Sequence, residues 1–428
     1  MLDARSIDRR LVVLGAVLVQ LSLGALYAWS VFTPALKAAG WSKLDTQIVF
    51  SVSLAVFAVT MVWAGSRMLT IGPRALAMRG GLILGLGYVL AGLSGGTGFW
   101  AILATVGVIG GIGIGLAYVV PIAVGMRWFP DRKGMITGIA VAGFGFGAMG
   151  WVKLADNWGQ LIARVGLADT FIVYGIAFAV LVSVGSIWMV FPIGGWLPPG
   201  YVPPQPTQAA TSGGRDFTRA QMLTTPQFYL IFATFAACAA AGLMAIGLMK
   251  LYPMEALQAA GRSAAEASAI ASTAMAVAFS LANGIGRIVW GTLSDRLGRR
   301  LAILIMAASQ GVLFLSFTTM AGNEYLLYLG AALIGFNFGG NFALFPTMTA
   351  DTFGNAKVGQ NYPVVFLSYG VGGIAGPILG GMLGDLGNFP LAFSACGVAC
   401  LVGAGCIFLV RPPKVPEPVP VREPALTA

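Results

Sequence analysis

The sequence contains no histidine and very few charged side chains. Lys, Arg, Asp and Glu together make up 9% of the chain, against roughly 25% in soluble globular domains. The absence of histidine removes the commonest catalytic base, metal ligand and intramembrane proton relay. The four cysteines lie within long apolar runs, at spacings that fit no metal-ligand set. The composition therefore excludes a soluble globular protein and predicts no enzyme active site, no metal and no cofactor.

Long apolar runs occupy most of the chain, which is 57% hydrophobic. A transmembrane helix needs about 20 mostly apolar residues to cross the ~30 Å hydrocarbon core of a membrane. Twelve runs meet this requirement, and because they are continuous they predict helices and not the alternating strands of a β-barrel. The predicted fold class is an all-α membrane protein with twelve transmembrane helices. The runs cover about 11–34, 47–69, 77–95, 99–123, 134–153, 168–192, 226–249, 265–293, 300–319, 324–347, 358–383 and 388–410.

The basic residues are distributed unequally between the two sides of these predicted helices. With the N-terminus in the cytoplasm, 18 of the 25 Lys and Arg residues fall in cytoplasmic segments, six fall outside, and Arg287 lies within a run. This positive-inside bias predicts that both termini are cytoplasmic and that the chain resides in the cell inner membrane. The net charge of +10 is then explained by an anionic lipid leaflet, and nucleic acid is not expected as a partner.

A polar segment rich in Pro, Gly, Ser and Thr divides the twelve runs into six and six. The loop "GSRMLTIGPR" (Gly65–Arg74) recurs as "GTLSDRLGRR" (Gly291–Arg300), 226 residues later. Such a repeat predicts two related six-helix bundles, which is typical of a secondary transporter with its site between the halves. The predicted organisation is an N-terminal bundle, a cytoplasmic linker whose end forms a short interfacial helix with Phe217, Met222 and Leu223 on one side, a C-terminal bundle and a disordered tail. These parts cover 1–192, 193–224, 225–412 and 413–428.

Arg287 is the main functional candidate, because it lies in the apolar run 265–293. Placing an arginine at the centre of a membrane helix costs ~2.5–3.5 kcal/mol on insertion scales, so such a charge suggests a function. The alternative is an arginine that snorkels from a helix end. No Asp or Glu lies in the interior of any predicted span. An arginine without an internal counter-ion predicts an anionic substrate, and its planar fork of donors matches a carboxylate.

Several motifs show a resemblance to a known family. "GTLSDRLGRR" matches the Gly-x-x-x-Asp-Arg-x-Gly-Arg-Arg loop of the major facilitator superfamily, and "RWFPDRKG", "MLTTPQF" and "ALFPTMTADTFG" resemble the oxalate/formate antiporter family, which is related to the monocarboxylate transporters. The resemblance implies a gating role for the loop. In the first-half copy of the loop, Leu69 and Thr70 replace the Asp and the following basic residue. The gating residues that the resemblance implies are Gly291, Asp295, Arg296, Gly298 and Arg299.

The same resemblance assigns substrate-binding positions. Arg287 aligns with the arginine that binds the substrate carboxylate in this family. Asn283, one helical turn earlier and on the same face, stands where animal monocarboxylate transporters have an aspartate linked to proton coupling. A simple interhelical hydrogen bond is the alternative role for Asn283. The remaining aligned positions are aromatic and would form a box around the substrate. They are Tyr27, Trp29, Tyr118, Phe144, Phe338 and Phe342.

Tyr369 is the clearest indication of the substrate. It occupies the position at which the oxalate exchanger has a lysine that helps to bind a dianion. One arginine suits one carboxylate, so the resemblance implies a monocarboxylate and not oxalate. Lys250 is a candidate for a replacement cation, although an interfacial role suits it better.

The predicted function is therefore secondary active transport of small monocarboxylates of the lactate, pyruvate, formate and acetate class by alternating access. Proton-coupled symport and anion exchange both remain open, and the protein is expected to be a monomer in the lipid bilayer. A dicarboxylate or inorganic anion exchanger is the alternative. A channel is disfavoured because channels use rings of like groups, and an intramembrane enzyme because no nucleophile–base pair or ligand set is present. A sensor built on a carrier fold is a further alternative.

Overall fold

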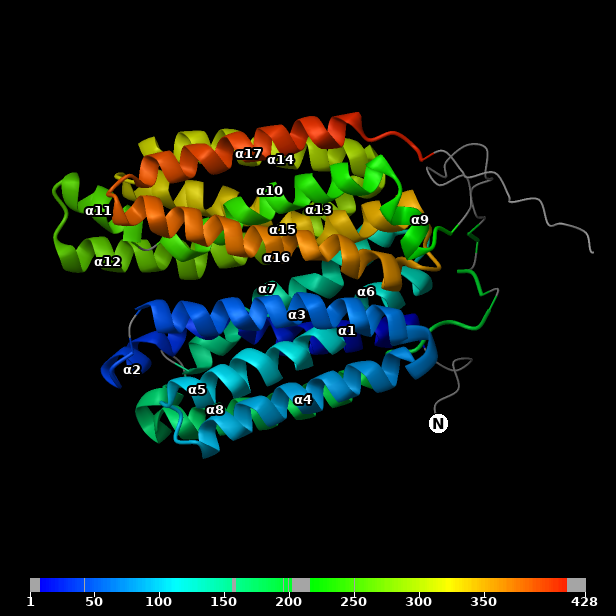
Figure 1. The fold of residues 1–428 in the computed structure, drawn as a ribbon, viewed down its shortest axis with the longest axis horizontal. Coiled ribbons are helices and arrows are strands. Elements are labelled where there is room, and N and C mark those ends of the chain that lie inside the picture. Colours follow the sequence, from blue (N-terminus) through cyan, green and yellow to red (C-terminus); the bar gives the residue numbers. More distant parts are fainter. Residues whose placement is uncertain are drawn as a thin grey trace, which may run out of the picture.

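The computed structural model describes residues 8–41, 43–155, 159–194, 196–198, 200–201, 216–249 and 251–413, and the regular structure in these ranges is helical (Figure 1). A 3₁₀ segment, Gly24–Val31, follows α1, and π-helical segments, Leu103–Gly110 and Ala274–Phe279, precede α6 and α13. The helices are α1 (Arg9–Leu23), α2 (Thr33–Ala38), α3 (Lys43–Ile71), α4 (Pro73–Leu93), α5 (Phe99–Ile102), α6 (Gly111–Trp128), α7 (Lys133–Ala155), α8 (Leu161–Ser186), α9 (Arg219–Leu223), α10 (Pro226–Leu248), α11 (Leu251–Ala259), α12 (Ala264–Thr273), α13 (Ser280–Leu297), α14 (Arg299–Met320), α15 (Glu324–Phe353), α16 (Val358–Asp385) and α17 (Phe389–Leu409).

Eleven helices in the described part of the chain are long and apolar enough to cross a membrane. They coincide with eleven of the twelve predicted runs. The remaining run, 265–293, is not among these eleven, but it is helical from Ala264 to Leu297 through α12, a π-helical segment and α13. The run predicted at 168–192 is shifted. Its helix is α8 (Leu161–Ser186).

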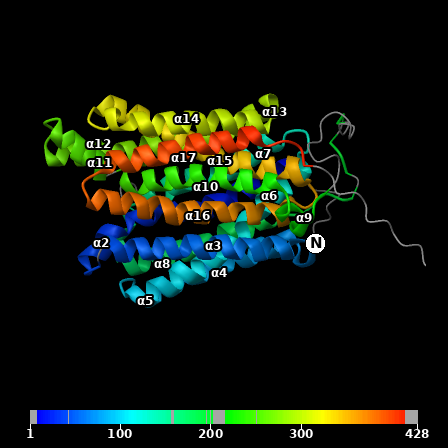
Figure 2. The ribbon, with the colours of Figure 1, turned by 45° about the horizontal axis from the view of Figure 1, so that its top comes forward.

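The helices lie roughly parallel in two groups (Figure 1). Helices α1 to α8 form the lower group, with α6 and α7 on the side that faces the upper group, and α10 to α17 form the upper group. Helix α7 packs on α1 and on α13, and α3 packs on α16. Figure 2 confirms that α3 and α16 are neighbours in a second view. The α7–α13 and α3–α16 pairs therefore join the two groups.

The packing between the groups is tightest at one end of the bundle, which carries α9, Gly65 and Asp295 and is called here the α9 end. A Cβ atom placed on Gly65 would collide with Gly359 O. The opposite end of the bundle is called here the far end. Toward it, the contacts between α3 and α16 are longer: a Cβ atom on Gly370 would be 3.4 Å from Ala58 Cβ, and one on Gly373 would be 4.0 Å from Leu54 Cδ1. Close approach of backbones at small residues is typical of membrane helices. The two groups thus touch through their backbones at the α9 end and separate toward the far end.

Helices α7 and α13 repeat this pattern on the other side of the bundle. Cβ atoms on Gly134 and Gly138 would collide with the backbone oxygens of Gly291 and Arg287, whereas one on Gly145 would lie 3.0 Å from Asn283 Oδ1. On both sides the closest backbone contacts lie toward the α9 end, which is therefore the closed end of this conformation.

Candidate functional site

Arg287 lies at the centre of the candidate site, on α13. Its side chain is fully buried, with 0% of its surface exposed. Asn283, one turn earlier on the same helix, accepts a hydrogen bond from Arg287 Nε at 3.0 Å, and Val141 O of α7 accepts one from Nη1 at 2.9 Å. These bonds fix the guanidinium plane between the two groups of helices. The burial is the opposite of a snorkelling geometry, in which the charged head would reach the helix end.

The third nitrogen of Arg287, Nη2, is buried and has no hydrogen-bond partner in the described part of the chain. No described Asp or Glu forms an ion pair with this arginine either. A buried charge without a counter-ion is strongly unfavourable unless a partner satisfies it. The Nη2 edge therefore has the properties of an anion-binding group. Because Nε is already bonded to Asn283, only the Nη1/Nη2 end of the fork is left for a carboxylate.

Aromatic rings cover the guanidinium. Arg287 Cζ lies 4.2 Å from the ring centre of Phe342 on α15 and 5.6 Å from that of Phe144 on α7. Cation–π contacts of this kind partly compensate the loss of water around the charge, by ~0.5–2 kcal/mol each. Phe144 also meets Tyr27 edge to face at 4.9 Å and Tyr118 at 5.6 Å. The structure thus brings together Arg287, Tyr27, Tyr118, Phe144 and Phe342 in one cluster.

Three tyrosine hydroxyls lie in this cluster. Tyr27, in the 3₁₀ segment after α1, and Tyr369, on α16, share a hydrogen bond between their hydroxyls. Both are electrostatic neighbours of Arg287. Tyr118 Oη, on α6, is buried next to the Arg287 guanidinium and makes no hydrogen bond of normal geometry with the described residues. Position 369, for which the resemblance implies a lysine in the oxalate exchanger, is therefore occupied here by a tyrosine hydroxyl that is hydrogen-bonded across the two groups of helices.

Phe338 makes no ring contact with Arg287 in the described structure, and neither does Trp29, whose ring meets that of Phe32 at 5.8 Å. The Phe338 ring meets Phe342 edge to face at 5.3 Å and Phe279 at 6.1 Å. A Cβ atom on Gly242 of α10 would collide with the Phe338 ring. Phe338 therefore packs between Phe342 and α10, on the face of α15 that contacts α10.

Several residues near Arg287 were absent from the sequence-based set. Gln20 of α1 is fully buried and donates to Tyr118 O at 3.1 Å. Tyr362 and Phe366 precede Tyr369 by seven and three positions, so the helical period places all three on one face of α16 and could have identified them. Val141 acts through its backbone oxygen, which no side-chain pattern reveals.

The predicted loop motif lies at the closed end. Asp295 accepts hydrogen bonds from the backbone N–H groups of Gly134 (3.0 Å) and Met135 (2.8 Å) at the start of α7. The dipole of α7 also favours a negative charge at this end of the helix. Arg299 binds Asp295 at 2.6 Å and Asp351 of α15 at 2.9 Å. Gly291 contributes a backbone contact with Gly134. The motif thus ties α13 and α15 to the start of α7.

Two other motif residues have different roles. Gly298 has φ +83°, a left-handed conformation suited to glycine, and separates α13 from α14. Arg296 is exposed and takes part in none of the ion pairs of the described residues. Lys133, which was not among the predicted residues, binds Asp351 at 2.9 Å and completes the link between the two groups of helices.

The linker contains the predicted short helix, α9 (Arg219–Leu223), but its environment differs from the prediction. Phe217 and Met222 are buried against the protein, whereas Leu223 is 36% exposed, so the three do not share one side. Phe217 and Met222 therefore pack against the protein and not against the membrane surface that was expected. Lys250 and residues 414–428 lie outside the described residues.

Comparison with known proteins places this geometry in a family. An MFS-type transporter of Escherichia coli (strain K12), YhjX, is 30% identical over 376 residues, which cover 86% of each chain. The chain belongs to the major facilitator superfamily. A model of this superfamily matches residues 230–427. The protein is thus a multi-pass membrane transporter, and the superfamily assignment supports a transporter and not an enzyme.

Other relatives carry more specific names. The oxalate:formate antiporter of Oxalobacter formigenes is 25% identical over 402 residues, covering 94% of this chain and 90% of that one. Apicoplast pyruvate carrier 1 of Toxoplasma gondii is 25% identical over 375 residues, covering 75% and 66%. A crystal structure of the superfamily transporter FucP in the outward conformation matches with a TM-score of 0.64 at 15% identity, over 95% and 99% of the two chains, which shows the shared fold.

Proposed function

We propose that this transporter carries small monocarboxylates through one central site that is open to each side of the membrane in turn. The observation that carries this proposal is the buried Nη2 of Arg287, which lacks a partner among the described residues. A carboxylate would supply the missing counter-ion and acceptor. Asn283 would orient the guanidinium, Tyr118 would donate to the carboxylate, and the rings of Phe144 and Phe342 would exclude water from the pair.

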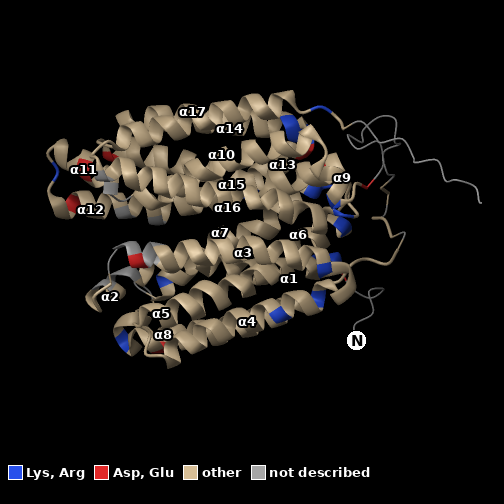
Figure 3. Cartoon of the chain, in the orientation of Figure 1, with Lys and Arg blue, Asp and Glu red and all other residues tan. Residues whose placement is uncertain are grey.

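The proposed architecture is twelve transmembrane helices in two six-helix bundles, 1–192 and 225–412, joined by the linker 193–224. The continuous helix from Ala264 to Leu297 supports a twelfth span. Lys and Arg residues gather at the α9 end (Figure 3). Since basic residues favour the cytoplasmic side, this end would face the cytoplasm and the conformation described would be open to the outside. A monomer in the cell inner membrane is the proposed form.

A site restricted to one carboxylate is supported by Tyr369. Its hydroxyl is neutral and already bonded to Tyr27, so it does not supply the second positive charge that a dicarboxylate needs. The alternative, exchange of oxalate or another small dicarboxylate or inorganic anion, is favoured by the name of the Oxalobacter relative. The pyruvate carrier of Toxoplasma favours the monocarboxylate.

Uptake into proteoliposomes tests the proposal. Labelled lactate, pyruvate, formate, acetate and oxalate would be offered separately, with and without a proton gradient and with and without substrate inside. We expect uptake of monocarboxylates and little of oxalate. Stimulation by the proton gradient would identify symport, and stimulation by internal substrate would identify exchange. Uptake of oxalate alone would contradict the proposed role of Tyr369.

A further inference from the structure

The hydrogen-bond donors around Arg287 outnumber the acceptors of a single carboxylate. A guanidinium has five N–H donors, of which two are bonded to Asn283 and Val141. Three donors of Arg287 remain, and Tyr118 adds its hydroxyl. Tyr27 and Tyr369 bond to each other, which uses one of their two hydroxyl hydrogens and leaves the other. A carboxylate offers about four acceptor positions, so these donors already suffice for formate or acetate.

Tyr362 supplies one more donor, which the site as proposed does not use. The residue lies near the start of α16, is 0% exposed, and its Oη has no hydrogen-bond partner among the described residues. Its ring meets that of Phe366 at 5.7 Å, and Phe366 meets Tyr118 at 5.4 Å. Arg287 and Tyr118 are among its electrostatic neighbours. A buried hydroxyl left without a partner is unfavourable by about 1–3 kcal/mol, which points to a ligand atom or a water that completes it.

We propose that Tyr362 is a specificity-determining residue that donates a hydrogen bond to an oxygen on the second carbon of the substrate. The favoured substrates are then 2-oxo and 2-hydroxy monocarboxylates, whose extra oxygen takes up the donor that formate and acetate leave unsatisfied. Sites built to bond a substrate oxygen discriminate strongly against analogues that lack it, because their buried donor is left without a partner. This inference rests on the proposed function and narrows its substrate class.

Tyr362→Phe tests this inference, because it removes one hydroxyl and keeps the ring. Uptake of labelled pyruvate, lactate and acetate would be measured in proteoliposomes. We expect KM for pyruvate and lactate to rise roughly tenfold, the loss of about one buried hydrogen bond, while KM for acetate changes less than twofold. Tyr88→Phe is the matched control, since Tyr88 is 3% exposed and packs against Phe171 and Phe178, away from Arg287.

The outcomes separate this inference from the function on which it rests. If the parent chain takes up neither pyruvate nor acetate, the proposed function fails and the role of Tyr362 falls with it. If the parent takes up both and Tyr362→Phe changes both equally, or changes neither, the proposed function stands and the role of Tyr362 is wrong. A melting temperature equal to that of the parent would show that the variant is folded.

An independent observation concerns the closed end of the bundle. In the second half of the chain Asp295 caps α7 through Gly134 and Met135. The matching position of the first half is Leu69, which is 53% exposed and has no carboxylate. The helix that Leu69 would face, α16, begins after Lys357 with no side-chain cap. A shallow hollow lined by Leu69 and Gly359, among others, lies at this place.

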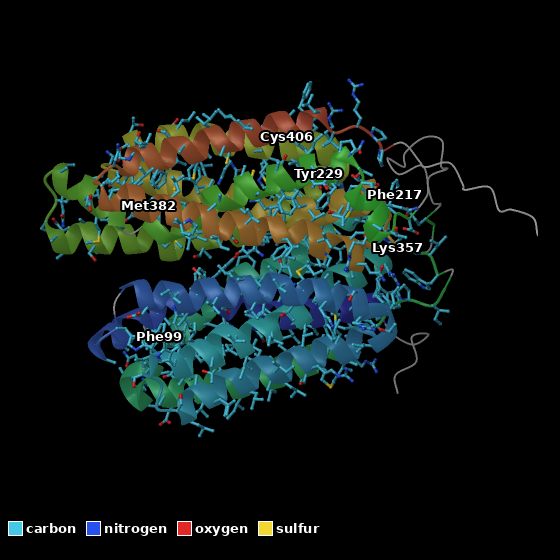
Figure 4. The ribbon with its side chains drawn as sticks, viewed as in Figure 1. Phe99, Phe217, Tyr229, Lys357, Met382 and Cys406 are labelled. Carbon is cyan, nitrogen blue, oxygen red and sulfur yellow. The ribbon has the colours of Figure 1, made fainter. Side chains whose placement is uncertain are left out.

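The end of the linker occupies this side of the closed end instead. Asp216 Oδ1 accepts a hydrogen bond from Ala356 N at 3.0 Å, and Phe217 N donates to Phe353 O at 2.8 Å. Asn361 Nδ2 donates to Phe217 O at 3.0 Å, and the side chain of Phe217 is 3% exposed. Figure 4 shows Phe217 and Lys357 close to α9 at this end. The segment is thus bound to the loop between α15 and α16 and to the first turns of α16.

Two arginines extend these contacts to the other group of helices. Arg127 of α6 donates to Ala356 O at 2.5 Å, so Ala356 is held by Asp216 on its N–H and by Arg127 on its carbonyl. Arg219 Nη2 makes long contacts with Val62 O of α3 (3.4 Å) and Gln360 O of α16 (3.5 Å). Both arginines therefore bridge the two groups where the loop motif lacks its aspartate.

We infer that the segment Asp216–Leu223 acts as a latch, which replaces the missing carboxylate of the first-half loop in holding the α9 end closed. Opening of that end requires α3 and α6 to leave α16, and hence breaks the contacts of Arg127 and Arg219. The hydrogen bonds of Asp216 and Phe217 lie within one group, so they would be kept on opening and anchor the segment that carries Arg219. Weakening the latch should shift the carrier toward the conformation open at the α9 end.

Thiol labelling tests the latch. Met68 lies on α3, is 2% exposed and lines the hollow, so Met68→Cys should react with an impermeant maleimide from the α9 side only when this end opens. We expect Arg219→Gln and Asp216→Ala each to raise the labelling rate at least threefold, with the parent that lacks the added cysteine as background. Asp131→Asn is the control, because Asp131 pairs only with its neighbour Arg132 at 3.7 Å among described ion pairs. If labelling is unchanged or slowed in both variants and their melting temperatures are normal, the latch is wrong. A variant that does not fold is replaced by Arg219→Lys, which should be labelled at a rate between those of the parent and Arg219→Gln. An unchanged rate in Arg219→Lys counts against the latch.

Discussion

Tyr27 and Tyr369 lie 342 positions apart in the chain, yet their hydroxyls share a hydrogen bond beside Arg287. The bond joins the 3₁₀ segment after α1 to the middle of α16, and thus one group of helices to the other. Beyond it, toward the far end, α3 and α16 separate. The pair therefore marks the level at which the open side of the bundle ends and the candidate site begins.

Replacement of Tyr369 by lysine should admit a second carboxylate. The introduced ammonium would lie near Arg287, and a charge-assisted hydrogen bond contributes about 1.5–3 kcal/mol. We expect Tyr369→Lys to strengthen inhibition of monocarboxylate uptake by oxalate by about 10-fold or more, measured as the inhibition constant in proteoliposomes. Tyr369→Phe is the control, since it removes the bond to Tyr27 without adding charge. Equal inhibition of the two variants by oxalate would show that this position does not contact substrate.

Removal of the Arg287 charge should abolish transport and leave the fold intact. Arg287→Ala loses the charge-assisted hydrogen bonds to the substrate, and each such bond raises the affinity for substrate about 10- to 150-fold. We therefore expect kcat/KM for uptake to fall at least 100-fold. The variant loses the desolvation penalty of the buried charge but also two hydrogen bonds and two ring contacts, so we expect the melting temperature to stay close to that of the parent. Arg164→Ala, at an exposed position, should be neutral. Normal uptake by the Arg287 variant would show that the arginine is structural.

A carboxylate at position 283 should compete with the substrate for Arg287. Asn283 Oδ1 already accepts from Nε, so Asn283→Asp would place a negative charge on the same bond. Ionised, this group neutralises the arginine and lowers substrate affinity; protonated, it restores the free charge. We expect uptake by Asn283→Asp to be weak at neutral pH and to rise on acidification, measured as initial rate against pH with the same gradient in the parent. A pH profile identical to that of the parent would contradict the competition.

The sequence predicted the elements better than their contacts. Composition and run length identified the membrane helices, because burial in lipid demands apolar residues over a defined length. The family resemblance identified Arg287 and its aromatic neighbours. It did not predict that Nε would be taken by Asn283, that Val141 would accept through its backbone, or that Tyr369 would bind Tyr27. These contacts depend on the distance and rotation between α7, α13 and α16, which are set by packing of glycine faces and not by the period of any one helix.

The ion pairs at Asp351 should stabilise closure of the α9 end. Asp351 accepts from Lys133 of α7 and from Arg299 of α14, both at 2.9 Å. Asp351→Asn leaves two cations facing each other without their carboxylate, and we expect a cysteine placed at the buried Thr137 of α7 to be labelled from this end several-fold faster. Asp131→Asn, in the same region but without a link between the helix groups in the described structure, should not change the rate. Equal rates in the two variants would show that backbone packing alone closes this end.

Gly134 provides the most direct test of closure by backbone packing. An added methyl group would collide with Gly291 O and lie 2.8 Å from Asp295 Oδ1, and overpacking of this kind costs about 1–3 kcal/mol. That penalty applies only while the α9 end is closed, so Gly134→Ala should shift the equilibrium toward opening at that end by about 5- to 150-fold. Gly150→Ala on the same helix meets nothing within 4 Å and is the matched control. Labelling of the cysteine at Thr137 should rise, and substrate binding from the far side should weaken, in the Gly134 variant alone. If the Gly134 variant binds substrate and is labelled like the parent, the backbone contact between α7 and α13 does not hold this end closed.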